Sequence, residues 1–373
     1  MTDIITDKFW GKLMEYTAKT VSKAAIDTLL RRYCAAQLPP EGHFHYHQGV
    51  FLSGVEKMAH ILNDESYYTY IKEWVDAMVA SDGEFYCFNP GALDDLQPGI
   101  LLFDILNRTG EEKYKRLLDK IIDVLSVYPE NEEGGYFHMA GFPHQMWLDG
   151  LYMAGPLAVE YGVKYNREDL IKKAFKQMKL MYKHCKKEEN GLLYHGWDCL
   201  KQAPWADKDG VSHEVWGRAA GWFAIGGLDM IELLPEGHEE KEEAKQILKD
   251  YLAAVLKYQD EETGLWYQVV DKGEKEGNWL EASCSMLFTC AVLKAIRLGI
   301  LPEINLDNAK KGFCGLKRFI NIDENGKFLL SGICVGTGIG DFDYYINRET
   351  SENDLHGMGA FLLMCAEMAK LEN

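Results

Sequence analysis

The 373-residue sequence predicts an all-α fold in which six inner helices form a ring inside six outer helices, an α/α toroid. A short Gly-aromatic segment recurs six times, and a stretch that is apolar on nearly all sides follows each one. Charged amphipathic stretches lie between these units. Helices that are apolar all round are buried, whereas amphipathic helices lie on a core. A closed ring forming one domain over residues 1–373 is favoured over an open α-solenoid, because no polar capping repeat is evident.

Each repeated segment begins with glycine, as a turn followed by a short strand does. We expect these turns and short strands to gather as loops at one end of the ring. The segments read GHFHYH (42–47), GEFYCF (83–88), GGYFHM (134–139), GLLYHGWD (191–198), GLWYQVVD (264–271) and GKFLL (326–330).

The predicted inner helices follow the segments in order, and their apolar residues leave no polar face. Residues 111–128 and 167–185 exemplify the outer helices, since their apolar residues recur at i, i+3, i+4 and i+7. The inner stretches begin as QGVFLSGV (48–55), DLQPGILL (95–102), MWLDGLYM (146–153), WGRAAGWF (216–223), WLEASCSM (279–286) and LHGMGAFL (355–362).

The composition excludes several partners. Lys and Arg number 40 against 58 Asp and Glu, a net charge of −18, which would repel nucleic acids and anionic membranes. Nine scattered cysteines without a CxxC pair indicate reduced thiols, and we expect a cytoplasmic protein without a signal peptide or membrane span. Aromatic residues make up 12%, enough to fill a core or to line a groove for sugars.

If the inner helices start at one end of the ring, the polar groups near their starts converge there. Eight of the eleven histidines also fall at helix starts or in the loops. The helix starts contribute Gln48, Asp94 with Asp95 and Gln97, Asp149, Arg218, Glu281 and His356, and the loops add Tyr46, His47, His138, His195, His213, Trp197 and Trp216.

Asp149 stands out because nearly all its neighbours are apolar. Burial disfavours a carboxylate, so we expect a raised pKa, which suits a proton donor near neutral pH. A helix cap or a buried Arg partner is the alternative role. Asp94 and Asp95 precede a helix start, where capping explains one of them and a site role the other. Glu281 is the repeat equivalent of Asp149, and a salt bridge to a neighbouring helix explains it equally well.

Arg218 lies between Trp216 and Trp222, a combination suited to a sugar carboxylate and a sugar ring, although a buried Asp or Glu partner would also explain the arginine. His43, His45 and His47 would share one face of a strand and bind a metal. Hydrogen-bonding histidines are the favoured interpretation. The run GTGIGD (336–341) fits no βαβ unit, so we expect no dinucleotide.

Six motifs in order resemble the unsaturated rhamnogalacturonyl hydrolases of glycoside hydrolase family 105. The resemblance runs from about residue 40 to the C-terminus. The motifs are HYHQGVF (45–51), FPHQMWLDGLYMAGP (142–156), GLLYHGWD (191–198), WGRAAGW (216–222), GLWYQVVDKG with NWLE (264–281) and RETSENDLHGMGAF (348–361).

The resemblance implies an (α/α)6 barrel that needs neither a metal nor an organic cofactor. It implies small oligosaccharide substrates with a Δ4,5-unsaturated galacturonate at the non-reducing end, hydrolysed by protonation and hydration of the C4=C5 vinyl ether. It makes Asp149 the general acid and base and Asp94 the supporting carboxylate. The residues implied to hold the uronate are Tyr46, His138, His195, Trp216, Arg218 and Trp222.

Three other functions stay open at this point. An unsaturated glucuronyl hydrolase would act on the product of another polysaccharide lyase. A sugar epimerase would need a histidine pair for proton transfer, and a non-catalytic sugar-binding protein would have no use for a buried acid. After His138 the chain reads MAGFPH, which is less polar than expected for relatives that act on rhamnogalacturonan.

Overall fold

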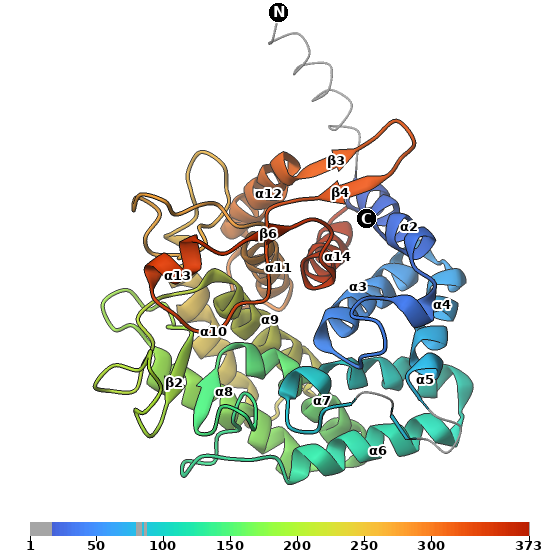
Figure 1. Ribbon diagram of the computed structural model, residues 1–373, viewed down its shortest axis with the longest axis horizontal. Helices are drawn as coiled ribbons and strands as arrows, with labels where there is room; N and C mark the ends of the chain where they lie inside the picture. The colour runs from blue at the N-terminus through green and yellow to red at the C-terminus, as the bar shows by residue number, and fades with distance from the viewer. Residues whose placement is uncertain (1–16, 80–83, 86–87, 373) are drawn as a thin grey trace, which may run out of the picture.

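A computed structural model describes residues 17–79, 84–85 and 88–372 and confirms the predicted ring of helices (Figure 1). Each inner element contacts the next, and the last inner helix packs against the first, so the ring closes and the open solenoid is wrong. The inner elements are α3 (Tyr46–Leu62), η3 (Gln97–Ile100) with α5 (Leu101–Thr109), α7 (Asp149–Tyr165), α9 (Gly217–Leu233), α11 (Ala282–Arg297) and α14 (Leu355–Ala369).

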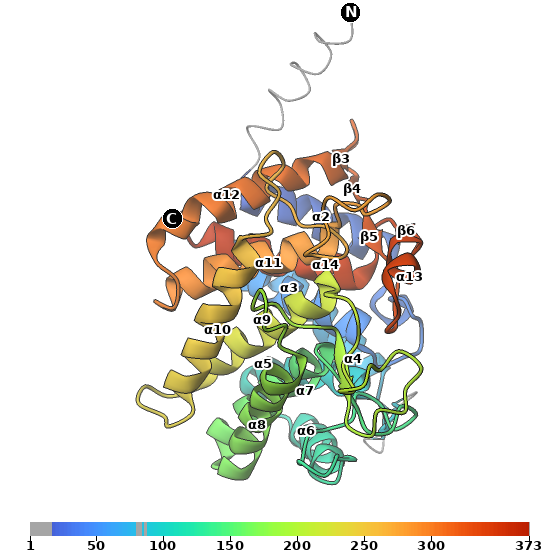
Figure 2. The same cartoon turned by 90° about the vertical axis from the view of Figure 1, so that its left-hand side faces the viewer.

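The outer helices lie on the outside of this ring, as their amphipathic patterns predict (Figure 2). They are α2 (Ala18–Arg32), α4 (Glu65–Ala77), α6 (Glu112–Ser126), α8 (Glu168–Cys185), α10 (Lys241–Leu256) and α12 (Leu306–Gly315). The second inner helix differs from the prediction, because it starts as two 3₁₀ turns and becomes regular only at Leu101. Pro98 lacks the backbone N–H that a regular α-helix would use beyond its first turn.

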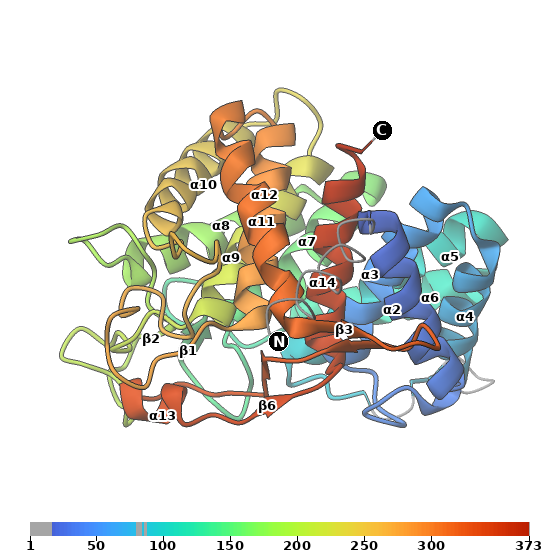
Figure 3. The same ribbon diagram turned by 90° about the horizontal axis from the view of Figure 1, so that it is seen from above.

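In the described part of the chain, short strands form three antiparallel pairs, and they gather with helix α13 (Phe342–Ile346) at one end of the ring (Figure 3). Met146 lies opposite Trp197 in the first pair. The pairs are β1 (Gln145–Trp147) with β2 (Gly196–Asp198), β3 (Ile320–Ile322) with β4 (Phe328–Leu330), and β5 (Ile333–Cys334) with β6 (Thr350–Ser351). The remaining 3₁₀ turns are η1 (Ala35–Gln37), η2 (Leu93–Asp95), η4 (Glu303–Asn305) and η5 (Leu316–Phe319).

The glycine that opens each repeated segment has a positive φ wherever the structure describes it, at positions 42, 134, 191, 264 and 326. Only glycine adopts this conformation without strain, which explains why the segments share it. The segment at 83–88 lies largely outside the described residues. The segment at 42–47 is no strand, because helix α3 already begins at Tyr46.

The core is one continuous set of buried apolar side chains between the two rings. Much of the aromatic excess lies there, since Trp74, Trp216, Trp222 and Trp266 are almost fully buried. Within the described residues, none of the helices is both long and apolar enough to cross a membrane.

Helices α7 and α9 cross closely at a glycine. A Cβ atom placed on Gly226 would lie 2.9 Å from the backbone nitrogen and 3.0 Å from the Cα of Tyr152. The neighbouring Gly227 differs, because its Cβ would meet only side-chain ends, 3.2 Å from the methyl carbons of Leu248 and from Cε of Met178. Backbone cannot move aside as these side-chain ends can.

We therefore expect Gly226→Ala to lower the free energy of unfolding by about 1–3 kcal/mol relative to Gly227→Ala. Both changes gain the same helix propensity, so the difference reports the clash alone. Denaturant unfolding of the two variants measures it. Equal stabilities would show that the two helices can separate without cost.

Candidate active site

A cavity of about 370 Å³ opens where the inner helices begin. Six of the eight residues predicted to act in catalysis or to hold the uronate line it, namely Tyr46, Asp94, His138, Asp149, Trp216 and Arg218, and His45 and His47 line it as well. Further lining residues were not predicted from the sequence, namely Met139, Phe142, Trp147, Met153 and Gly336–Gly338. GTGIGD was a usable signal for the last group, but it was considered only as a dinucleotide motif.

Trp222 does not line the cavity, contrary to its predicted place beside the uronate. Its side chain is 1% exposed and packs against Tyr152, with ring centroids 4.6 Å apart. Trp216 caps the start of α9, whereas Trp222 lies more than a turn further into the helix and faces α7. Of this pair, only Trp216 reaches the cavity.

Asp149 is the first residue of α7, and a histidine holds its carboxylate. Nε2 of His195 lies 3.2 Å from Oδ2 of Asp149, and Nδ1 of the same ring lies 2.8 Å from the hydroxyl of Tyr345. Burial raises the pKa of Asp149, but the hydrogen bond and charge of His195, with smaller effects of His138 and Arg218, outweigh it and lower the pKa. The predicted rise is therefore wrong. Asp149 is neither a helix cap nor an ion-pair partner of an arginine among the described residues.

Asp94 behaves in the opposite way. Burial, the negative charge of Asp149 and that of Asp95 raise the pKa of Asp94 to about 8. Asp95 accepts a hydrogen bond from the backbone N–H of Asn89 at 2.7 Å, so Asp95 organises the loop while Asp94 faces the cavity. One carboxyl is thus neutral and its neighbour ionised near neutral pH, a division that defines acid and base roles in many active sites.

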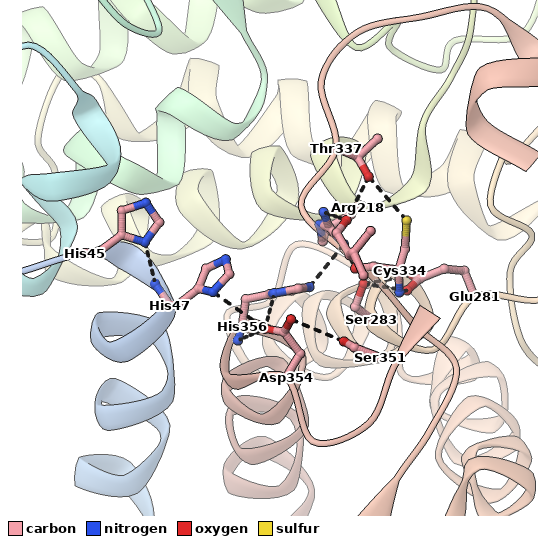
Figure 4. Close-up of polar contacts among 11 residues, drawn as sticks. His45, His47, Arg218, Glu281, Ser283, Cys334, Thr337, Ser351, Asp354 and His356 are labelled. Atoms are coloured by element: carbon pink, nitrogen blue, oxygen red, sulfur yellow. Dashed lines mark hydrogen bonds and ion pairs between the residues drawn. The ribbon is translucent and has the colours of Figure 1, made fainter. Parts of the chain in front are cut away.

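Arg218 reaches the cavity from the first turn of α9, and its Cζ lies 4.4 Å from the ring centroid of Trp216. Its guanidinium donates to the carbonyl oxygens of Cys334 and Val335 and contacts Nε2 of His356 at 3.0 Å (Figure 4). No carboxylate among the described residues forms an ion pair with Arg218. The alternative of a buried acidic partner for Arg218 is therefore wrong within that part of the chain.

Glu281 has a structural role instead of lining the cavity. It caps helix α11 by accepting from the backbone N–H of Cys284 at 2.5 Å. Its other oxygen accepts from the backbone N–H of Cys334 at 2.9 Å, so Glu281 ties strand β5 to the helix. The carboxylate is completely buried and is satisfied by these bonds and by Ser283.

Among the described residues the three histidines of the HxHxH run are not grouped as metal ligands, although the ring centroids of His45 and His47 lie 5.1 Å apart. His45 lies 4.0 Å from Asp94, His47 lies 3.6 Å from Asp354, and His43 is exposed. Because α3 begins within the run, successive residues turn by about 100° and do not alternate as they would on a strand, so His45 and His47 face different carboxylates. His47, Asp354 and His356 do come close enough to hold a metal ion, but both ring nitrogens of His356 already have protein partners.

Three parallel rings form one wall of the cavity. His138 and Trp147 stack with centroids 4.3 Å apart, and Phe142 stacks on Trp147 at 5.3 Å. Exposure rises along the stack, from 6% for His138 through 9% for Trp147 to 39% for Phe142. The stack therefore runs from the buried end of the cavity to its mouth. Burial lowers the pKa of His138 to about 4, so its ring is neutral.

Comparison with known proteins agrees with this architecture. The Glycosyl Hydrolase Family 88 model matches residues 18–372. The unsaturated rhamnogalacturonyl hydrolase YesR of Bacillus subtilis is 28% identical over 256 residues, which is 67% of this chain and 70% of that protein. A family 105 glycoside hydrolase structure from C. acetobutylicum is 33% identical, has a TM-score of 0.89 and covers 94% of this chain and 99% of that one. A heparin-specific unsaturated glucuronyl hydrolase (14% identical, TM-score 0.73, 95% and 97% covered) shares the fold.

The raised pKa of Asp94 has a consequence for stability. In the unfolded chain the carboxyl loses its proton near the ordinary value of 3.8, whereas the folded protein keeps the proton up to about pH 8. Between these values the folded state binds more protons, so this contribution to stability falls as pH rises. We expect Asp94→Asn to become more stable than the parent with rising pH, by at most about 1.4 kcal/mol per pH unit.

Thermal unfolding of both proteins between about pH 5 and about pH 8 measures this difference. Asp169→Asn is the control, since Arg167 lowers the pKa of the exposed Asp169 and its difference should stay flat over the same range. A flat difference for Asp94→Asn would contradict the raised pKa.

Proposed function

The chain belongs to glycosyl hydrolase family 88 and is a glycosidase, and on that premise we propose that it releases the Δ4,5-unsaturated galacturonate from rhamnogalacturonan-derived oligosaccharides. One observation carries the proposal. A single cavity holds two carboxyl groups, Asp94 and Asp149, whose pKa values differ, together with Arg218, which forms no ion pair with a carboxylate of the described residues. The two carboxyl groups can act as acid and base, and the arginine suits an anionic sugar.

The cavity supports action at a chain end. Its inner end is closed by the packed ring, where Trp216 and Arg218 are 1% and 2% exposed, so a sugar chain enters from the mouth. The terminal uronate would occupy the inner part, with its carboxylate at Arg218 and its flattened ring against Trp216. The rest of the oligosaccharide would point outward past Phe142.

The proposed reaction is a hydration. A carboxyl group donates a proton to C4, and water adds to C5 as it gives a proton to the carboxylate so formed. The resulting C5 hemiketal opens to a ketone, which leaves a hemiacetal at C1. That hemiacetal collapses to an aldehyde and expels the neighbouring sugar as an alcohol. One water molecule is consumed, and the acid is regenerated.

Asp149 is the proposed acid and base, and His195 orients it. In the free enzyme the Asp94–Asp149 pair carries its proton on Asp94, because their charges repel and His195 favours the ionised form of Asp149. Entry of an anionic substrate adds negative charge and removes water, which raises the pKa of Asp149 toward that of a donor. The pair of Asp94 and Asp149 would then still share one proton, because the charge of one carboxylate disfavours ionisation of the other.

The mouth of the cavity supports rhamnose as the expelled sugar. The stretch after His138 is less polar than expected for relatives that act on rhamnogalacturonan, but its apolar Met139 and Phe142 line the cavity and suit the methyl group that distinguishes a 6-deoxy sugar from a hexose. We further propose that residues 1–373 act as one catalytic domain in the cytoplasm. The net charge of −18 supports small, already shortened substrates, because a polyanion would be repelled.

The reaction is tested with a disaccharide of unsaturated galacturonate and rhamnose, followed through the near-UV absorbance of the C4=C5 bond. We expect the absorbance to disappear, and deuterium to enter C4 in D₂O. Asp149→Asn should lower kcat by about 10²–10⁴-fold while the fold persists, since an amide cannot transfer the proton. Turnover of the saturated disaccharide, or near-normal kcat in the variant, would contradict the mechanism.

The expelled sugar is tested with the same uronate linked to rhamnose, to glucose or to a methyl group. Phe142→Ala should lower kcat/KM for the rhamnose compound by about 5–20-fold, equivalent to about 1–2 kcal/mol, and leave the methyl glycoside unchanged. Leu200→Ala is the control, because Leu200 is 40% exposed but lies outside the cavity lining. An equal loss on all three compounds would place Phe142 outside the subsite of the expelled sugar.

A further inference from the structure

The guanidinium of Arg218 is held on one side by protein groups. Nη1 donates to the carbonyl oxygen of Cys334 and contacts Nε2 of His356 at 3.0 Å, and Nη2 donates to the carbonyl oxygen of Val335 at 2.9 Å. These three bonds leave the Nε–H and one Nη2–H of the five N–H groups without an acceptor among the described residues. Because Arg218 lines the cavity, those N–H groups are available to a ligand there.

The contact with Arg218 determines the protonation of His356. A guanidinium has no lone pair, so Nε2 of His356 must accept and its proton must lie on Nδ1. Nδ1 lies 2.7 Å from Oδ1 of Asp354, so this proton lies beside a carboxylate oxygen. His356 is completely buried. Its neutral ring lies between the carboxylate of Asp354 and the guanidinium of Arg218 (Figure 4).

Because both ring nitrogens of His356 contact protein groups, the cluster of His47, Asp354 and His356 is not a metal site. A metal bound by His47, Asp354 and His356 would need the lone pair of Nδ1 on His356. That nitrogen carries the proton as long as Arg218 donates to Nε2. The cluster is thus a chain of polar contacts from Arg218 through His356 to Asp354, not a set of free ligands.

Asp354 is anchored at the far end of this chain. It caps helix α14, accepts from the hydroxyl of Ser351 at 3.2 Å, and lies 3.6 Å from Nδ1 of His47. Burial raises the pKa of Asp354, but the contact with the ring N–H of His356 and the positive charge of Arg218 hold it well below the ordinary value. The carboxylate is therefore ionised and fixed to the start of an inner helix.

We propose that Asp354 and His356 are positioning residues that orient Arg218, and that this chain makes the enzyme prefer a sugar carboxylate over its neutral counterpart. The proposal rests on the proposed function for the identity of the substrate. The imidazole separates the two charges, so the Arg218 charge is not consumed by Asp354 and stays directed at the cavity. Without that spacer, Arg218 is free to turn to Asp354 or to Asp149.

The test compares the unsaturated uronide with its methyl ester in His356→Leu, His356→Gln and the parent enzyme. His356→Leu breaks the chain, and we expect the preference for acid over ester to fall by about 10–100-fold, mainly through KM for the acid. His356→Gln keeps an acceptor for Arg218 and a donor for Asp354, and should retain most of the preference. Equal losses on acid and ester, or an unchanged ratio in His356→Leu, would overturn the proposal.

A binding measurement separates this proposal from the proposed reaction. Calorimetry with saturated galacturonate and its methyl ester should show acid preference in the parent and its loss in His356→Leu, whether or not the enzyme turns over the unsaturated compound. Asp354→Asn is the second variant, because asparagine caps a helix as well as aspartate but lacks the charge. It should also reduce acid preference, and an unchanged preference in both variants would refute the positioning role.

Discussion

Closure of the inner ring by helix α14 against helix α3 is the contact on which the site depends. A Cβ atom on Gly359 would lie 2.6 Å from the backbone carbonyl of Val50, so the backbones of the two helices approach closely and leave no room for a larger residue. This approach brings the start of α14, with Asp354 and His356, beside the start of α3, with Tyr46 and His47. The starts of α7 and α9 add Asp149 and Arg218 to the same cavity. Helix N-termini also carry partial positive charge, which favours an anionic ligand.

The acidic composition is compatible with an anionic substrate, because salt screens the charges on the surface whereas groups inside the cavity act on the substrate at short range. Exposed charges are largely screened beyond about 8–10 Å in physiological salt. Inside the cavity the balance is local, since Arg218 is buried at 2% exposure and is not neutralised by a described carboxylate. Asp94 adds little negative charge there, because its raised pKa keeps it protonated near neutral pH. The net charge of −18 therefore describes the surface and not the site.

The local sequence was sufficient to predict the ring of helices, because the apolar pattern of each helix shows whether it is buried on all sides or on one face. It was also sufficient to single out Asp149 and Arg218, whose charges stand among apolar neighbours. It was not sufficient for the pKa of Asp149, because the decisive partner, His195, is 46 residues away. Trp222 was placed beside the uronate because it flanks Arg218 in the sequence, but its side chain points to Tyr152 of α7 instead of the cavity. His45 and His47 were expected on a strand because the start of α3 could not be located to within a residue.

Two carboxylate–imidazole pairs meet at the cavity, and they are arranged in opposite order. In one pair, the carboxylate of Asp149 faces the cavity and His195 lies behind it. In the other pair, the carboxylate of Asp354 lies behind His356, and His356 contacts Arg218, which faces the cavity. The connection between β5 and β6 contacts both, since Val335 accepts from Arg218 and Tyr345 bonds to His195. Gly336–Gly338 of the same connection line the cavity between them. One segment therefore contacts both Arg218, which we propose binds the sugar carboxylate, and His195, which holds the proposed acid Asp149.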